Sequence, residues 1–290
     1  MIAFVFPGQG SQKRGMGQGL FDEVREYLAV ENEVDALLGY SMRKLCLEDP
    51  DNRLKETQCT QPSLYVVNAL HYYKAVGDGT RPSWLAGHSL GEYNALLAAG
   101  VFDFMTGLRL VQKRGELMAQ AKNGGMGAVI GMDSAAIPRV LNDNGLTSID
   151  VANFNSPSQT VVSGPLDDIK RAGPFFEKAG AQMYIPLQVS AAFHSRYMAD
   201  AAKAFADFLA PMSFNALRIP VVANATAQPY PADNASESVK SLLVKQITHS
   251  VLWAQSIRFL IGQGVSQFSE IGPGNVLTRM VQQIQQQKEQ

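Results

Sequence analysis

Cysteine is scarce in this chain: only Cys46 and Cys59 occur among 290 residues. The pair has neither the spacing of a thiolate metal site nor enough members for a disulfide framework. We therefore expect two free thiols in a reducing compartment, and no metal site is predicted. Histidine is almost as scarce, with four residues, so any histidine chemistry has few candidates.

Excess charge is also missing, because 25 Lys and Arg residues face 26 Asp and Glu residues, for a net charge of -1. Such a balance gives no electrostatic reason to expect nucleic acid or an anionic membrane as a partner. No apolar run is long enough to span a bilayer, since the best candidate, "VLWAQSIRFLIGQGV", carries Arg258 in its middle. The first residues, "MIAFVFPGQG", lack a basic leader and a cleavage site. These absences predict a soluble, cytoplasmic protein.

Apolar residues, by contrast, are plentiful, at 46% of the chain against 18% charged residues. This composition and length suit a large domain with a smaller insert. Ile2 to Phe6 forms a short apolar run, helical patterns follow in "LFDEVREYLAVENEVDALLG" and "QPSLYVVNALHYYKAV", and "SWLAGHSLGEYNALLAAG" reads as strand, tight turn and helix. The succession predicts an α/β fold.

A different pattern occupies residues 125–190. Its segments read as strand, helix, strand, strand, helix and strand, the order of a ferredoxin-like unit. Gly173-Pro174 should interrupt or kink the second helix. We predict an α/β-hydrolase-like large subdomain at 1–124 and 191–290, with the ferredoxin-like small subdomain at 125–190 and chain crossings near Gly124 and Ser190.

The motif Gly87-His88-Ser89-Leu90-Gly91 has the G-x-S-x-G form of a nucleophile elbow. Glycines on both sides permit a sharp turn from strand to helix, which exposes the serine hydroxyl at a helix N-terminus. Ser89 is therefore the candidate nucleophile, and the N–H of Leu90 is a natural donor to an oxyanion.

A second glycine-rich loop, "PGQGSQ" (residues 7–12), follows the first strand. It is not a dinucleotide loop, because Lys13 stands where G-x-G-x-x-G needs glycine. Two loops at neighbouring strand ends can converge on one site, so this loop can supply a second oxyanion donor. A simple turn before a helix is an equally good interpretation.

The general base should be a histidine. His71 lies within a helical pattern, and His88 should point away from the nucleophile and support the turn. His194 and His249 both lie at polar junctions after the serine, which is the chain order of α/β-hydrolases; the position of His194, at the return from the insert, favours it. No carboxylate for a third triad member is found, because the candidates look like caps or turns: Asp103, Asp143, Asp150, Asp167 and Asp168.

Arg114 is unusual because it falls within the apolar stripe of a helix. At about 100° per residue, that stripe also holds Leu110, Val111, Leu117, Met118 and Ala121. A buried guanidinium is costly unless it is paired. It could pair with an internal carboxylate, extend to the surface, or bind a carboxylate of the substrate. The last alternative predicts an acidic acyl group.

Six motifs in this order, "FVFPGQGSQ", "GHSLGE", "QKRGELM", "ANFNSPSQTVVSG", "AAFHS" and "EIGPGNVL", resemble the malonyl-CoA:acyl-carrier-protein transacylases. The resemblance spans nearly the whole chain. Other stretches look closest to the freestanding acyltransferases that serve modular polyketide synthases in trans. Leu90 and Phe193 resemble the malonyl-type pattern, although Ala191 replaces the first histidine of the His-Ala-Phe-His that multidomain members show.

The resemblance implies Ser89 as nucleophile, His194 as base and Arg114 as the partner of the malonyl carboxylate. Gln9 and Leu90 would supply oxyanion N–H groups, and the backbone carbonyl of Gln246 would hold the histidine. Asn155 would lie near the rim of the site, with no assigned role. Malonyl-CoA would be the substrate, a phosphopantetheinylated acyl carrier protein the partner, and no cofactor would be bound. The alternatives are an editing acyl hydrolase or esterase, and a non-catalytic docking module with the same fold.

Overall fold

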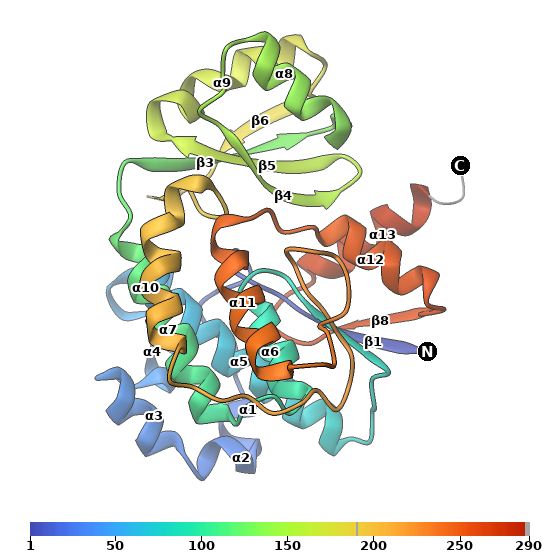
Figure 1. The fold of residues 1–290 in the computed structure, drawn as a ribbon. Coiled ribbons are helices and arrows are strands. Elements are labelled where there is room, and N and C mark those ends of the chain that lie inside the picture. The colour runs from blue at the N-terminus through green and yellow to red at the C-terminus, as the bar shows by residue number, and fades with distance from the viewer. Residues whose placement is uncertain (190, 288–290) are drawn as a thin grey trace.

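The computed structural model describes residues 1–189 and 191–287, which form two subdomains, each built on its own sheet (Figure 1). The larger subdomain contains both ends of the described chain. The smaller one, formed by the middle of the chain, lies across one end of it (Figure 1). In the described ranges, no helix is both long enough and apolar enough to cross a membrane.

The large sheet has four parallel strands in the order β7-β2-β1-β8. The strands are β1 (Ile2–Phe6), β2 (Trp84–Gly87), β7 (Val221–Val222) and β8 (Gln267–Glu270). Strand β1 is buried on both faces: Phe4 and Phe6 pack into the main core, and Ala3 and Val5 pack into a second core behind the sheet. Such a strand reads as a continuous apolar run, as the sequence predicted.

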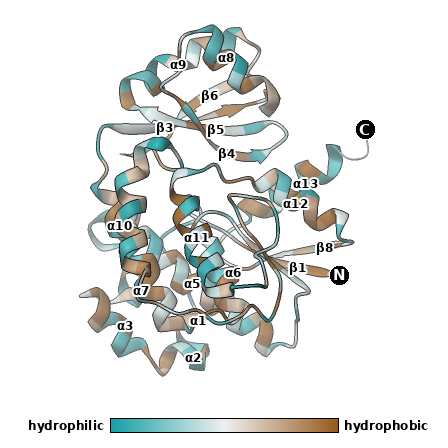
Figure 2. Ribbon diagram, in the orientation of Figure 1, coloured by the Kyte–Doolittle hydropathy of each residue, from teal (hydrophilic) through white to brown (hydrophobic). Residues whose placement is uncertain are grey.

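Helices cover both faces of this sheet, the α/β arrangement expected from the sequence. They are α1 (Leu20–Glu23), α2 (Arg25–Leu28), α3 (Glu31–Leu38), α4 (Met42–Glu48), α5 (Thr57–Gly77), α6 (Gly91–Ala98), α7 (Phe104–Gln120), α10 (Ala199–Leu209), α11 (Ala235–Thr248), α12 (Trp253–Gly262) and α13 (Val276–Gln287). Helices α12 and α13 pack on the second core, and α5, α6 and α7 on the main one. Helix α13 alternates apolar and polar residues (Figure 2) because Leu277, Val281 and Ile284 form its buried stripe.

The small subdomain has the strand and helix order of a ferredoxin-like unit: β3 (Gly124–Ile130), α8 (Ile137–Asp143), β4 (Asp150–Ser156), β5 (Gln159–Pro165), α9 (Leu166–Lys178) and β6 (Met183–Pro186). Its antiparallel sheet has the order β4-β5-β3-β6. One face packs on α8 and α9 through Val129 and Val162. The other face contributes Met126, Ala128 and Val161 to the core of the large subdomain. The predicted fold class is therefore confirmed.

The predicted interruption of a helix at Pro174 was wrong. Helix α9 runs without interruption through Pro174, because Ile169, Ala172 and Phe176 hold it in the small core while Pro174 lies on its exposed side. The helical patterning predicted over residues 20–39 is confirmed, as three short helices, with the extended and buried Val24 between the first two.

The boundaries of the subdomains stay a prediction, although the small sheet begins at Gly124, one residue before the predicted start, and its last strand ends at Pro186. The predicted crossing at Ser190 lies outside the described residues. Short 3-10 segments complete the described elements: Pro50–Lys55, Ser134–Ala136 and Arg196–Met198.

Candidate active site

Ser89 stands in a strained turn between β2 and α6, with a φ of 50° in the left-handed region. The turn needs glycine on both sides: a Cβ on Gly87 would lie 2.0 Å from the backbone of Gly91, and one on Gly91 would lie 2.0 Å from the carbonyl oxygen of Phe6. Asn224 ties the turn together, since Ser89 N–H donates to its Oδ1 (2.7 Å) and its Nδ2 donates to the Gly87 carbonyl (2.6 Å). The serine hydroxyl is thus presented on a rigid support.

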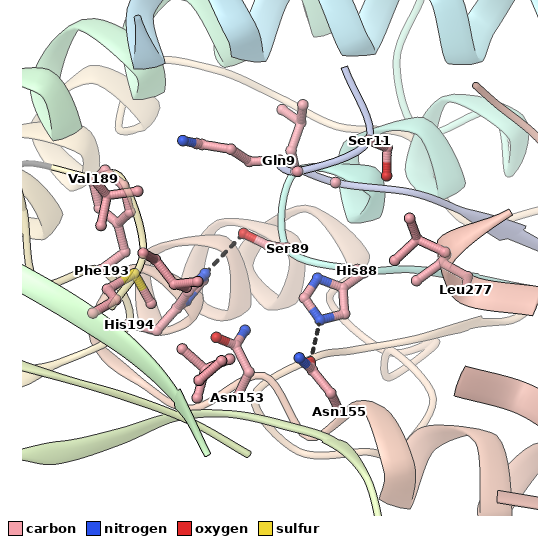
Figure 3. Close-up of a pocket in the computed structure, with 18 of the residues that line it drawn as sticks. Gln9, Ser11, His88, Ser89, Asn153, Asn155, Val189, Phe193, His194 and Leu277 are labelled. Atoms are coloured by element: carbon pink, nitrogen blue, oxygen red, sulfur yellow. Dashed lines mark hydrogen bonds between the residues drawn. The ribbon is translucent and has the colours of Figure 1, made fainter. Parts of the chain in front are cut away.

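The loop of residues 7–12 packs directly against this turn. A Cβ on Gly8 would lie 2.3 Å from the carbonyl oxygen of His88, so only glycine allows the two loops to approach so closely. Gln9, Leu90 and Ser89 line one cavity (Figure 3). Among the described residues, neither Gln9 N–H nor Leu90 N–H donates to a protein acceptor. Both donors are therefore free to receive an oxyanion.

His194 reaches Ser89 from the segment that follows the small subdomain. Its Nε2 lies 2.8 Å from Ser89 Oγ (Figure 3), and its Nδ1 lies 2.8 Å from the backbone carbonyl oxygen of Gln246. Because a carbonyl only accepts, Nδ1 carries the proton, and the neutral ring offers a bare Nε2 to the serine hydroxyl. Burial, followed by the charge of Arg114, lowers the pKa of His194 to about 3, so the ring is neutral near pH 7.

None of the other three histidines is bonded to Ser89. His249 Nδ1 lies 3.0 Å from the Lys245 carbonyl oxygen, on the surface side of α11. His71 lies on α5. His88 Nε2 lies 2.8 Å from Asn155 Oδ1, and its ring packs edge-on against Trp253, so it supports the turn as expected while also lining the cavity (Figure 3).

The aspartates that sequence inspection rejected all have other partners. Asp103 caps α7 by accepting from Thr106 N–H. The remaining four bind basic side chains: Asp143 with Arg139, Asp150 with Arg196, Asp167 with Lys170 and Asp168 with Arg171. A backbone carbonyl therefore occupies the position that a carboxylate holds in a catalytic triad.

Arg114, on α7, is only 1% exposed and its guanidinium lies beside the nucleophile. Nη1 donates to Gln61 Oε1 (2.8 Å), and Nη2 donates to Ser89 Oγ (3.1 Å) and to Gln246 Oε1 (3.0 Å). The guanidinium carbon lies 5.6 Å from the centre of the Tyr93 ring. Nε is buried without a hydrogen-bond partner among the described residues.

Two alternatives for Arg114 are excluded by these contacts. Its burial rules out extension to the surface. In the described part of the chain, no carboxylate lies within 4.0 Å of it, so it has no direct ion pair. The charge of Glu92 acts on it from a greater distance, and the side chain of Gln246 bridges the two residues. A buried cation with an unused donor is suited to a carboxylate ligand.

The cavity around these groups has a volume of about 350 Å³ and lies between the two subdomains. Its polar lining includes Ser89, His194 and Arg114 from the large subdomain. The small sheet supplies polar residues, Asn153 and Asn155 among them, and an apolar wall of Met126, Ala128 and Val161. Within residues 1–189 and 191–287, no group of three or more His, Cys, Asp or Glu side chains could hold a metal ion. The buried Cys46 and Cys59 are free thiols, as predicted.

Sequence inspection missed Glu92, Gln61 and Asn224. Glu92 was within reach of that inspection, because it belongs to the same "GHSLGE" motif as Ser89 and lies in an otherwise apolar helix. Gln61 and Asn224 give no comparable signal, since each lies in an ordinary polar context and reaches the site only through the fold.

The chain is similar to proteins of one known family. Residues 3–290 match the acyl transferase domain family. The chain belongs to this family. A polyketide biosynthesis malonyl CoA-acyl carrier protein transacylase of Bacillus velezensis is 51% identical over 291 residues, covering 100% of this chain and 98% of the relative. The resemblance to malonyl-CoA:acyl-carrier-protein transacylases is thereby confirmed.

Solved acyl transferases share the fold over almost the whole chain. The crystal structure of a malonyl CoA-acyl carrier protein transacylase from Burkholderia pseudomallei has a TM-score of 0.93 and 46% identity, covering 99% of this chain and 98% of that one. A malonyl-transacylase in complex with a type II polyketide synthase acyl-carrier protein has a TM-score of 0.91 and 36% identity, covering 98% of this chain and 92% of that one.

Proposed function

We propose that this acyl transferase moves malonyl groups from malonyl-CoA to the phosphopantetheine thiol of an acyl carrier protein, through an ester on Ser89. The observation that carries the proposal is the buried guanidinium of Arg114, 3.1 Å from Ser89 Oγ and without a carboxylate partner among the described residues. A serine hydrolase for neutral acyl groups has no use for such a cation, whereas a dicarboxylic acyl group supplies its missing anion.

The relatives support the substrate, the acceptor and the pathway. The 51% identical relative is named a polyketide biosynthesis malonyl CoA-acyl carrier protein transacylase, and one structural neighbour is a malonyl-transacylase bound to an acyl-carrier protein. We place the reaction in polyketide biosynthesis or in fatty acid biosynthesis. The two free thiols, Cys46 and Cys59, agree with action in the cytoplasm.

The first half-reaction forms the acyl-enzyme. Ser89 Oγ attacks the thioester carbonyl while His194 Nε2 accepts the hydroxyl proton. The N–H groups of Gln9 and Leu90 stabilise the oxyanion of the tetrahedral intermediate. The bond from carbon to the CoA sulfur then breaks, and His194 returns its proton to the leaving thiolate. Arg114 binds the malonyl carboxylate and orients the acyl group.

The second half-reaction transfers the malonyl group from Ser89 to the carrier thiol. The carrier thiol gives its proton to His194 and attacks the seryl ester, and the malonyl group leaves on the carrier sulfur as Ser89 recovers its proton. No atom changes its oxidation state in either half-reaction, so the proposed mechanism needs no redox cofactor.

A covalent adduct tests this account. Incubation with malonyl-CoA alone should add one malonyl group to the protein, measured by intact mass and located on Ser89 by peptide mapping. The Ser89→Ala variant should gain none. If the wild-type protein stays unmodified while a fluorophosphonate probe labels Ser89, the proposed donor is wrong; if neither reagent modifies it, the protein is a docking module.

The acceptor is tested on the same adduct. Addition of a phosphopantetheinylated acyl carrier protein should remove the malonyl group from Ser89 and place it on the carrier. Equally rapid loss without the carrier, with release of free malonate, would identify the chain as an acyl hydrolase instead.

A further inference from the structure

Gln246 does more than hold His194 through its backbone, because its side-chain amide bridges the nucleophile and the guanidinium. Its Nε2 donates to the Ser89 carbonyl oxygen (2.9 Å) and to Glu92 Oε2, while its Oε1 accepts from Arg114 Nη2 (3.0 Å). Both neighbours of the nitrogen are acceptors, and the neighbour of the oxygen is a donor. The amide therefore has one favourable orientation.

Glu92 is one of three groups that make the opposite orientation unfavourable, beside the Ser89 carbonyl and the Arg114 guanidinium. It is only 1% exposed, and its carboxylate accepts from Tyr230 Oη, Asn224 N–H and Gln246 Nε2. It forms no ion pair with a described basic side chain within 4.0 Å. A buried carboxylate that holds three neutral donors and no cation is expensive to keep in a core. The proposed reaction does not use it.

We propose that Glu92 is a positioning residue for acyl selection: its carboxylate fixes the Gln246 amide so that the amide oxygen holds Arg114 in place for an acidic acyl group. The inference depends on the proposed function, since it concerns how the clamp for malonyl is aligned.

The proposed role of Glu92 depends on the fact that an ionised carboxylate cannot donate a hydrogen bond. Above its raised pKa of about 7, Glu92 is an ionised carboxylate that only accepts, so it repels an amide oxygen and attracts an amide nitrogen. The two acyl donors are therefore compared at about pH 8.5, where the carboxylate is ionised. A glutamine at position 92 has the same shape but both accepts and donates, and it would tolerate Gln246 in either orientation. In the flipped form, the amide nitrogen would face Arg114 Nη2, and two donors would oppose each other.

The consequence should be selective for acyl groups that need the guanidinium. Malonyl depends on Arg114 to pair with its carboxylate, whereas acetyl has no carboxylate. Loss of alignment at Gln246 should therefore slow acylation by malonyl-CoA more than acylation by acetyl-CoA. A defect of general stability would slow both donors equally.

The experiment compares acylation of Ser89 by the two donors, without carrier protein, by intact mass in single-turnover reactions. Glu92→Gln should lower the malonyl-to-acetyl rate ratio about tenfold, the usual effect of one mismatched charged hydrogen bond. Asp35→Asn is the matched control: this carboxylate also accepts from a backbone N–H group, that of Met42, but it does not line the cavity. The malonyl-to-acetyl rate ratio of this control should equal that of the wild-type protein.

A second variant shows whether Glu92 acts through Gln246. Gln246→Met keeps the backbone carbonyl and removes the amide, so it should lower the ratio by itself, and Glu92→Gln should add nothing in that background. An unchanged ratio in Glu92→Gln, or additive effects in the double variant, would overturn the inference. If Glu92→Gln does not fold, an unchanged malonyl-to-acetyl rate ratio in Gln246→Met is sufficient to overturn the inference. Absence of malonyl loading in the wild-type protein would instead refute the proposed function.

Discussion

At the scale of single residues, the proposed mechanism requires His194 to be neutral if it is to accept the proton of Ser89. Burial and the Arg114 charge lower its pKa to about 3 from the ordinary value of 6.5. The neutral, proton-accepting form is therefore present above about pH 3 and is lost only as the pH falls through that value. We predict that the rate of acylation by malonyl-CoA does not fall with a midpoint near 6.5.

The measurement is a pH profile of single-turnover acylation between pH 5 and pH 8. Glu92 is a second titrating group, because burial raises its pKa to about 7. The profile is therefore repeated with Glu92→Gln. An acid limb seen only in the wild-type protein belongs to Glu92, whereas a limb near pH 6.5 in both proteins would show that His194 titrates normally and would contradict this view of the site.

Sequence patterns identified the candidate residues that carry a local signature. Ser89 lies in a motif, and Arg114 breaks an apolar stripe. His194 was preferred over His249 by position in the chain, and its hydrogen bond to Ser89 depends on packing that no spacing encodes. The partners that tune these groups, Gln61 and Asn224, come from segments far away in the sequence, so their roles could not be predicted.

At the scale of elements, the passage from β2 to α6 depends on glycine. The Cβ of Gly91→Ala would lie 2.0 Å from the Phe6 carbonyl oxygen in the neighbouring strand, a contact that backbone movement alone can relieve. We predict destabilisation of about 3 kcal/mol and loss of fluorophosphonate labelling at Ser89. Thermal unfolding and the labelling rate measure the two effects.

Gly262→Ala provides the control for this substitution. Gly262 is the last residue of α12, and a Cβ there would meet no atom within 4 Å. The variant should be as stable as the wild-type protein or more stable by about 0.5 kcal/mol, because alanine favours the helix. Equal behaviour of both variants would mean that the turn tolerates a side chain and that its geometry is not fixed by glycine.

Element order was predictable because each unit carries its own signal. The strand, turn and helix at Ser89 and the six elements of the small subdomain follow from local periodicity and turn residues. Element boundaries were less predictable where tertiary packing overrides propensity. Helix α9 continues through Pro174 since Phe176 and Ala172 are held in a core, and a buried Val24 separates two of the helices within the helical pattern of residues 20–39.

At the scale of the whole molecule, the reaction site exists only because two subdomains meet. The large subdomain supplies the proposed nucleophile, base and cation, and the small one supplies the apolar wall of Met126 and Val161. The cation consequently lies in a largely apolar cavity where an anion is strongly favoured and its absence is costly. The existence of two subdomains was predictable from the sequence, but the alignment of their facing surfaces was not.

The most direct measurement is the rate of Ser89 acylation by malonyl-CoA and by acetyl-CoA in the wild-type protein and in Arg114→Ala. We predict that the wild-type protein prefers malonyl-CoA. In the variant, the rate of acylation by malonyl-CoA should fall about 100-fold or more, the effect expected of a buried charge pair. Acetyl transfer should change less, so that the preference inverts. A variant that still prefers malonyl-CoA would contradict the central claim that this guanidinium selects the acyl group.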